Sequence, residues 1–135
     1  MTRVREAMVP DPRVLPGTAS AQEAAELLVR PEVVSVIVVD GDRLLGLVTP
    51  AGLVERVVAA GRDPRTTPLS EVAVAAPFTV GPDVPADEAY RLMEEADCER
   101  APVIDGGRLV GVLSRSALQR RLAEDEPPPE PEPGR

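Results

Sequence analysis

The sequence has almost none of the residues that carry metal, thiol or acid–base chemistry. It contains no histidine and a single cysteine, Cys98, among its 135 residues. A disulfide framework and a metal site built from cysteine and histidine are therefore excluded. The usual general bases and nucleophiles are absent as well, so we expect no enzymatic activity. Cys98 follows a predicted helix, and we interpret it as a small packing residue rather than a redox sensor.

Aromatic residues and long apolar runs are equally scarce. Phe78 and Tyr90 are the only aromatic residues, which argues against stacking on nucleic-acid bases. The formal net charge of -8 also disfavours a phosphate backbone, so no nucleic-acid partner is predicted. No run of about 18 apolar residues occurs, and the first residues lack the apolar stretch of a signal peptide. We therefore predict a cytoplasmic protein with no membrane partner.

The chain instead contains one pattern twice, at an offset of 65 residues. Residues 4–57 align with residues 69–122 without a gap. The clearest copies are 40–49 and 105–114, in which a Val/Ile-rich run enters an Asp-Gly turn, an apolar run leaves it and a hydroxyl residue opens a helix. A chain of this length can bury one core if its halves pack together, whereas each half alone would be marginal. We predict one fold of two repeats, residues 1–66 and 67–122, followed by a tail over residues 123–135.

Each repeat is expected to form a short helical turn, an extended segment, a helix, two strands and a second helix. Ser20 and Glu23 have the spacing of a capping box, and Thr49 followed by Pro50 is a strong helix start. In the predicted helix over residues 86–96, Ala96 is expected to face inward. The Pro- and Glu-rich tail is predicted to be disordered with polyproline character. The elements are predicted at residues 4–10, 13–15, 20–30, 33–39, 44–48 and 49–60, and again at 69–74, 78–80, 86–96, 101–104, 109–113 and 114–122.

This order of elements resembles the cystathionine-β-synthase (CBS) domain, and the pair resembles a Bateman module. The motifs that carry the resemblance are Gly46–Thr49, Gly111–Ser114 and the apolar-Pro-Val-Val-Asp-like segment Ala101–Asp105. The resemblance covers about residues 4–122. It implies an α+β fold of two β-α-β-β-α repeats packed about a pseudo-twofold axis.

The same resemblance implies a regulatory function. CBS pairs bind adenosine-type ligands such as AMP, ADP or ATP in clefts between the repeats, and no other cofactor is expected. With no catalytic or transport domain attached, the module would signal to a separate protein partner. The alternative is a CBS-fold dimerisation or interaction module that binds no nucleotide. A homodimer is predicted because the last helix of each repeat carries more apolar positions than one small sheet can cover, namely Leu53, Val54, Val57, Val58, Leu118 and Leu122.

The family's Gly-x-x-Thr/Ser-x-x-Asp motif assigns roles within the two clefts. Its hydroxyl, here Thr49 or Ser114, caps a helix and can contact phosphate, although plain helix capping is the alternative role. Its Asp, which holds the ribose, is replaced by Gly52 and Ala117, so weak binding is expected. Arg115 follows the second cap and is either a phosphate contact or a solvated surface group.

The second cleft is predicted to be the better ligand site. Pro102 is expected to leave backbone groups of its strand free for a purine edge, whereas the equivalent residue in the first repeat, Ile37, belongs to a closed apolar strand. The candidate ligand-binding residues are Thr79, Ala101, Pro102, Val103, Ser114, Arg115 and Ala117 in the second cleft, and Val36, Ile37, Val38, Thr49 and Gly52 in the first.

Overall fold

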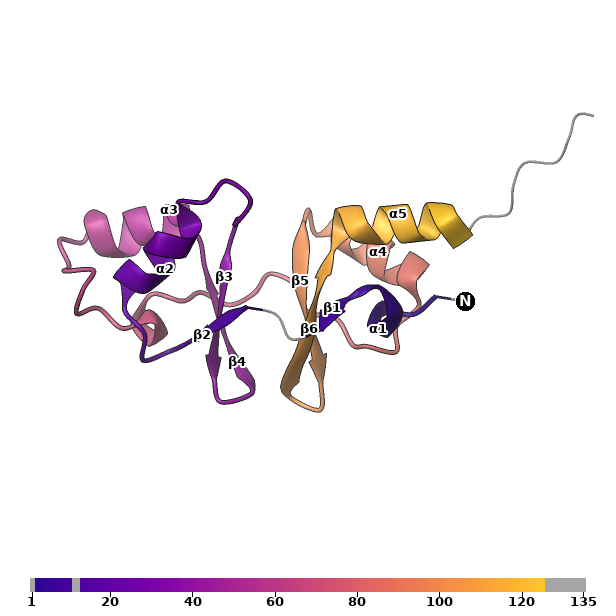
Figure 1. The fold of residues 1–135 in the computed structure, drawn as a ribbon, viewed down its shortest axis with the longest axis horizontal. Coiled ribbons are helices and arrows are strands. Elements are labelled where there is room, and N and C mark those ends of the chain that lie inside the picture. Colours follow the sequence, from indigo (N-terminus) through magenta and orange to yellow (C-terminus); the bar gives the residue numbers. More distant parts are fainter. Residues whose placement is uncertain (1, 11–12, 126–135) are drawn as a thin grey trace, which may run out of the picture.

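The chain forms two three-stranded sheets that stand side by side, with helices on the outer side of each sheet (Figure 1). The computed structural model describes residues 2–10 and 13–125. The first sheet has the order β2 (Val14–Pro16), β3 (Val36–Asp40), β4 (Arg43–Val48), and the second has the order β1 (Val9–Pro10), β6 (Arg108–Ser114), β5 (Arg100–Asp105). This is the α+β fold of two similar repeats that the sequence predicts.

The helices begin where the sequence places their caps. At the start of α2 (Ala21–Leu28), the Ser20 hydroxyl accepts from the Glu23 amide at 3.2 Å, and the Glu23 carboxylate accepts from the Ser20 amide at 3.1 Å. The predicted capping box is therefore confirmed. The remaining helices are α1 (Val4–Ala7), α3 (Pro50–Leu53), α4 (Ala86–Glu95) and α5 (Arg115–Asp125), with a short 3-10 helix, η2, at Leu69–Glu71.

Several element boundaries differ from the predictions. The opening helical turn, predicted over residues 4–10, ends at Ala7, and Val9–Pro10 forms strand β1. Strand β3 begins at Val36 rather than at residue 33, because the chain is still turning there and the Val33 amide donates to Arg30. Ala96 is exposed and follows α4, since the next residue, Asp97, has a φ of 50° and cannot continue the helix. Helix α5 continues to Asp125, past the predicted end at Leu122, because the first proline after it is Pro127. The rest of the predicted tail, residues 126–135, lies outside the described residues.

A further difference lies in the last helix of the first repeat. After α3 the chain continues as a π-helix, η1 (Val54–Val58), in which the Ala59 amide donates to the Val54 carbonyl at 2.8 Å. The wider turn leaves Val57 2% exposed in the core while Val54 and Val58 are 60% and 71% exposed. The sequence pattern predicts an ordinary α-helix here, because π-turns have no distinctive signature in the apolar spacing.

The opening segment of each repeat packs on the other repeat. Val4 of α1 lies in the core under the second sheet, and β1 pairs with β6, where Val9 faces Val112. In the same way Leu69 lies in the core under the first sheet, and Val74 pairs with Leu47 of β4. Each hydrophobic core is thus closed by residues from both repeats.

The two sheets meet through a third apolar cluster. Ile37, Val39 and Leu47 of the first sheet are buried there together with partly buried residues of the second, among them Leu109 and Val112. At the end of this contact the Leu109 amide donates to the Asp42 carbonyl at 2.8 Å, and Arg108 forms an ion pair with Asp42 at 2.9 Å. The burial of four consecutive β3 residues confirms the prediction that this strand is covered on both faces. Among the described residues no helix is long and apolar enough to cross a membrane.

Candidate functional site

The last helices of the two repeats start near the centre of the molecule and run outward in opposite directions (Figure 1). The Thr49 hydroxyl accepts a hydrogen bond from the Gly52 amide at 3.1 Å, and the Ser114 hydroxyl accepts one from the Ala117 amide at 3.3 Å. Ser114 also shares a hydrogen bond of 3.0 Å with the Ser116 hydroxyl. The capping role of both hydroxyls is therefore confirmed. Helix starts of this kind direct free amides and the positive end of the helix dipole at their surroundings.

Arg115 is held by acidic neighbours. Its guanidinium forms a hydrogen-bonded ion pair with Glu99 and lies 4.0 Å from the Asp97 carboxylate, and its amide donates to the Glu99 carbonyl at 2.8 Å. The side chain is 23% exposed and lines a hollow of about 410 Å³ that also contains Glu94. Three carboxylates surround one arginine, so this hollow disfavours an anion.

The partners of Arg115 could have been found in the sequence. Strands β5 and β6 pair so that Arg100 lies opposite Ser114, which brings the residues next to them, Glu99 and Arg115, together. Both strands are predicted from the sequence, and their Asp-Gly-Gly turn fixes the register to within a residue. Without this cross-strand neighbour, Arg115 is expected to be either a phosphate contact or a solvated surface group.

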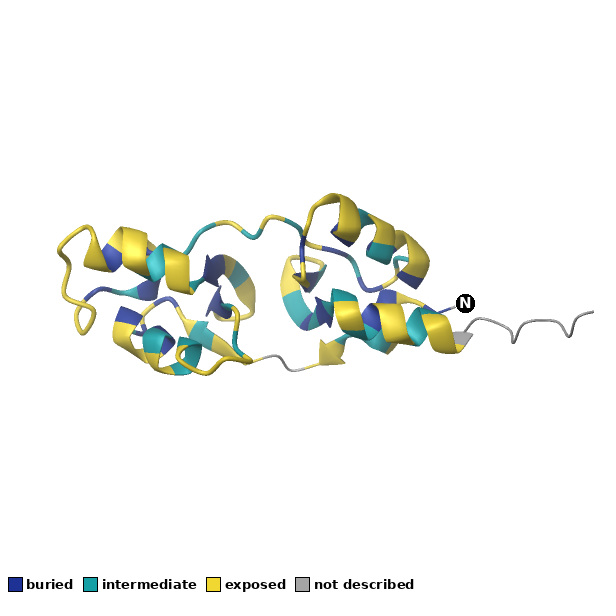
Figure 2. Ribbon diagram, turned by 90° about the horizontal axis from the view of Figure 1, so that it is seen from above, coloured by how far each residue is buried: buried dark blue, intermediate teal, exposed yellow. Residues whose placement is uncertain are grey.

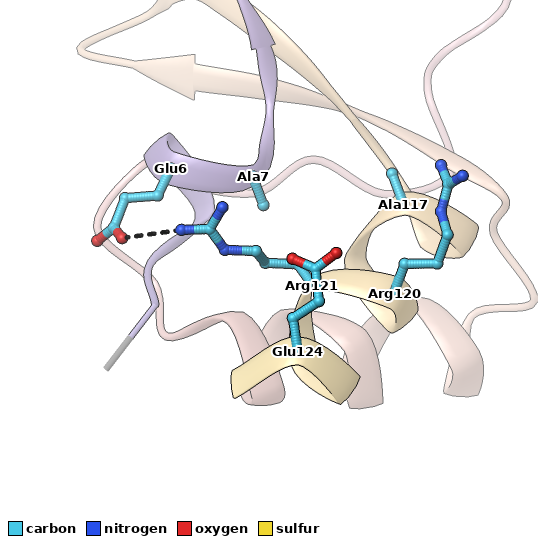
Figure 3. A pocket seen from close by; sticks show the side chains of 6 residues that line it. All are labelled: Glu6, Ala7, Ala117, Arg120, Arg121 and Glu124. Atoms are coloured by element: carbon cyan, nitrogen blue, oxygen red, sulfur yellow. Dashed lines mark ion pairs between the residues drawn. The ribbon is translucent and has the colours of Figure 1, made fainter. Parts of the chain in front are cut away.

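Ala117 faces a different hollow, between α1 and α5 (Figure 3). This hollow has a volume of about 290 Å³ and is lined by Glu6 and Ala7 from α1 and by Arg120, Arg121 and Glu124 from α5. The Arg121 Nη2 atom lies 3.9 Å from the Glu6 carboxylate, and the Arg121 Nε atom is buried without a hydrogen-bond partner among the described residues. The site thus offers two arginines beside the position of the missing ribose carboxylate.

Arg120 and Arg121 are not among the residues predicted for the site. Arg120 and Arg121 follow Ala117 by three and four residues, a spacing that places them beside it on a helix. That spacing is the signal in the sequence from which the two arginines could have been placed beside Ala117. The contribution of Glu6 from α1 could not be found in the same way, because it depends on the exchange of opening segments.

The strand residues assigned to the second cleft lie close to its helix start. Ala101, Pro102 and Val103 are buried in β5, and the Pro102 carbonyl accepts from the Val80 amide at 3.1 Å. Thr79 precedes that contact and is exposed. The backbone group expected to be free beside Pro102 therefore already has one partner, although a carbonyl oxygen can accept two hydrogen bonds.

The strand residues assigned to the first cleft are also buried. Val36, Ile37 and Val38 lie in β3, where Ile37 pairs with both Val14 and Leu47. The closed apolar strand expected around Ile37 is thus what the structure contains. Val36 pairs with Val48, the residue before Thr49, so the strand and the helix start of this repeat are adjacent.

This repeated fold, with a capped helix after each second strand, defines a pair of CBS domains. The family model of the CBS domain matches residues 4–59 and 67–124, and the chain belongs to that family. CBS domain-containing protein YhcV of Bacillus subtilis is 30% identical over 118 residues, which are 87% of this chain and 84% of YhcV. Hypoxic response protein 1 of Mycobacterium tuberculosis is 36% identical over 85 residues, and the match covers 63% of this chain and 59% of that protein.

Solved structures share the fold. The structure of Hypoxic Response Protein I with two coordinated zinc ions has a TM-score of 0.77 at 28% identity and covers 90% of this chain and 99% of that one. CBSX2 in complex with AMP has a TM-score of 0.75 at 24% identity, with coverage of 92% and 98%. In this protein, no group of three or more potential ligands among residues 2–10 and 13–125 is placed to hold a metal ion.

Proposed function

We propose that this CBS pair is a regulatory module that weakly binds an adenosine-type ligand and signals to a separate protein partner. The observation that carries the proposal is the pair of helix starts at Thr49 and Ser114, which lie on the inner side of their repeats. Helix starts favour phosphate through free amides and the helix dipole. CBSX2, solved with AMP, has this fold at 24% identity, which supports the fold alone.

The second repeat is the better ligand site, for a reason that differs from the one given by the sequence. Arg115 is neutralised by Glu99 and Asp97, and in the hollow beside Ala117 the Arg121 side chain is paired with Glu6, so the positive charge for a phosphate comes mainly from Arg120. The first repeat has Glu55 and Arg56 at the equivalent positions. One cation less in the first repeat means weaker attraction for a phosphate group.

Binding is expected to be weak because neither repeat supplies the ribose carboxylate. Gly52 and Ala117 occupy its positions. Losing a charged hydrogen bond to a sugar hydroxyl removes ~1.5 to 3 kcal/mol, or about ten- to a hundredfold in affinity. Adenine nucleotides should therefore bind about ten- to a hundredfold more weakly than they would with that carboxylate in place.

A melting assay with millimolar AMP, ADP and ATP tests the proposal. A ligand present at about 100 times its Kd stabilises the native state by about 2.7 kcal/mol and raises Tm by several degrees. Ala117→Asp restores the carboxylate and should tighten binding about tenfold or more. The increment should vanish for 2′,3′-dideoxy-AMP, which lacks the ribose hydroxyls.

Two controls make the assay specific. An aspartate at 117 also lies near Arg120 and Arg121 and at the start of α5, so it raises Tm slightly without ligand, and only the ligand-induced shift is compared. Gly52→Asp makes the same change in the first repeat, where a Cβ atom would lie 3.3 Å from the Thr49 hydroxyl. It should give a smaller ligand response. If neither the native protein nor Ala117→Asp responds to any nucleotide, the sensing proposal is wrong.

The second candidate function is a CBS-fold interaction module that binds no nucleotide. The acidic hollow around Arg115 and the missing carboxylates favour it. Both candidates include self-association into a homodimer, although not through all the residues predicted for it, because Val57 and Leu118 are buried in the cores. Light scattering at micromolar concentration should give a mass near twice 14.3 kDa.

A further inference from the structure

The opening segment of the chain and α5 lie side by side at the end of the molecule marked N (Figure 1 and Figure 2). The hollow beside Ala117 lies between them, and the residues that line it are exposed or half-buried, so a small anion can enter it. In Figure 3 the Arg121 side chain extends from α5 toward Glu6 of α1, whereas Arg120 extends in another direction. Arg121 is therefore the arginine that the opening segment can influence.

The guanidinium of Arg121 is only half paired. Its Nη2 atom lies 3.9 Å from the Glu6 Oε2 atom, which is too long for a hydrogen bond, and its Nε atom is buried without a partner among the described residues. Nε and Nη2 form one edge of the guanidinium, and a carboxylate or phosphate can accept from both at once. Buried donors are nearly always hydrogen-bonded in folded proteins, so this edge is a place where an oxyanion can bind.

Another arginine of the same segment shows what a complete pair looks like. Arg5 donates to the Asp83 Oδ1 atom from Nε at 3.1 Å and from Nη2 at 2.7 Å. Glu6 has a second contact instead, since its Oε1 atom accepts from the Arg3 amide at 3.4 Å and closes the first turn of α1. This contact holds the carboxylate on α1, at a distance from the Arg121 edge.

The charges of the hollow balance while Glu6 is in place. Two arginines, Arg120 and Arg121, and two carboxylates, Glu6 and Glu124, line it. Loss of the Glu6 carboxylate from the hollow leaves one net positive charge, which favours an anion. Both the geometry and the charge of the site therefore depend on one side chain of the opening segment.

We propose that Glu6 is a built-in competitor for the anion-binding site of the second repeat. Its carboxylate lies against the Nη2 atom of Arg121, and a phosphate group that binds there displaces it and accepts from both Nε and Nη2. The inference rests on the function proposed above and adds its control, because the opening segment sets how tightly the second repeat holds a phosphate. The coupling is reciprocal, so a bound phosphate also withdraws the Arg121 contact from α1.

Titration calorimetry with inorganic pyrophosphate at constant ionic strength tests the competition. Glu6→Gln keeps an oxygen for the Arg3 amide and removes the charge, so Kd should fall about three- to tenfold through loss of the ion pair and of the repulsion. Glu71→Gln is the matched control, since Glu71 is the equivalent residue of the first repeat and pairs with Arg62 at 2.5 Å. It should leave Kd unchanged. Glu124→Gln removes the same charge from the same hollow without freeing Arg121, and it should give a smaller gain.

A double-mutant cycle identifies Arg121 as the contested group. Arg121→Gln should weaken pyrophosphate binding about tenfold or more, and in that background Glu6→Gln should give no more than the small gain of Glu124→Gln. Melting curves show that each variant is folded. The proposal is overturned by an unchanged Kd in folded Glu6→Gln, by an equal gain from Glu124→Gln, or by a gain that persists in full without Arg121. Failure of both the native protein and Glu6→Gln to bind pyrophosphate overturns it as well.

AMP in the same titrations separates this inference from the function proposed above. If pyrophosphate binding depends on Glu6 while AMP binds neither to the native protein nor to Ala117→Asp, the competition stands and the sensing of an adenosine-type ligand is wrong. If AMP binds more tightly to Ala117→Asp but its Kd does not respond to Glu6→Gln, the sensing stands and the competition is wrong.

Discussion

Replacing Gly46 by alanine should strongly destabilise the fold, because the opening segment of the second repeat runs directly across this residue. A Cβ atom added to Gly46 would lie 2.3 Å from the Val74 carbonyl oxygen and 3.0 Å from its carbon. Contacts below about 3 Å with backbone atoms cannot be relieved by a side-chain rotation. The segment around Val74 would have to move away from β4.

The cost follows from what holds that segment. The Leu47 amide donates to the Val74 carbonyl at 2.8 Å, and the Val74 amide donates to the Leu47 carbonyl at 2.9 Å. Losing both hydrogen bonds costs about 0.5 to 1.5 kcal/mol each, and disturbing the neighbouring Val72, which is 1% exposed, adds an overpacking cost of about 1 to 3 kcal/mol. The sum of about 2 to 6 kcal/mol corresponds to a fall in Tm of roughly 8 to 24 °C, at about 4 °C per kcal/mol for a chain of this size.

Thermal unfolding of Gly46→Ala beside two other glycine variants measures this effect. Gly81→Ala is the neutral control, since its nearest neighbour, Val84 Cγ2, lies at an ordinary 3.8 Å. Gly111→Ala makes the equivalent change in the second repeat, where a Cβ would meet the Met8 sulfur at 2.7 Å and the Val9 carbonyl oxygen at 2.8 Å. Met8 can turn aside, and the remaining overlap with the Val9 backbone oxygen is milder than the overlap of 2.3 Å at Gly46, so Tm should fall here as well but by less. A Gly46→Ala protein that melts within about 2 °C of the native one would refute the reasoning.

Two further predictions concern the turn after α4. Asp97 has a φ of 50°. Asp97→Gly removes a steric cost of about 1 to 2 kcal/mol from the folded state, whereas the greater entropy of the unfolded glycine chain costs about 0.5 to 1 kcal/mol. The urea midpoint should therefore rise for Asp97→Gly and fall for Asp97→Ala, and the reverse order would contradict the backbone argument. Burial raises the pKa of the Cys98 thiol, whose sulfur contacts the Arg100 carbonyl, so an aromatic disulfide reagent should react much more slowly with the native protein than with the unfolded one. Because the pKa of the Cys98 thiol is higher in the folded than in the unfolded protein, its contribution to stability is complete below the ordinary cysteine pKa. This contribution is lost as pH rises toward the folded pKa. Between pH 7 and 10 the urea midpoint should therefore fall more for the native protein than for Cys98→Ala.

Local signals in the sequence predict most of the elements and the helix starts. The hydroxyls of Ser20, Thr49 and Ser114 cap their helices as expected, because capping depends only on residues three apart. The paired strands around the two Asp-Gly turns are equally local. The missed features depend on contacts between distant residues, as with Glu6 and Arg121 in the hollow beside Ala117.

The exchange of opening segments between the repeats is the largest feature that the sequence does not predict, and the internal repeat is the reason. Val4 and Leu69 occupy equivalent positions, and each lies in the core of the other repeat. Either arrangement buries the same apolar side chains, so hydrophobic periodicity cannot distinguish packing within a repeat from packing across repeats. Only the three-dimensional path of the chain decides between them.

The crossing of the opening segments means that no single cut divides this chain into two complete halves. A break within residues 61–66 would leave one piece without Leu69 and the other without Val4, and each piece would hold what its counterpart lacks. The pieces are therefore complementary fragments rather than independent folding units. One repeat by itself could close its core only by exchanging its opening segment with a second molecule, as in a domain-swapped dimer. Gene duplication and fusion of such a unit would produce the path of this chain, because the exchange of opening segments between two molecules would then take place within one chain.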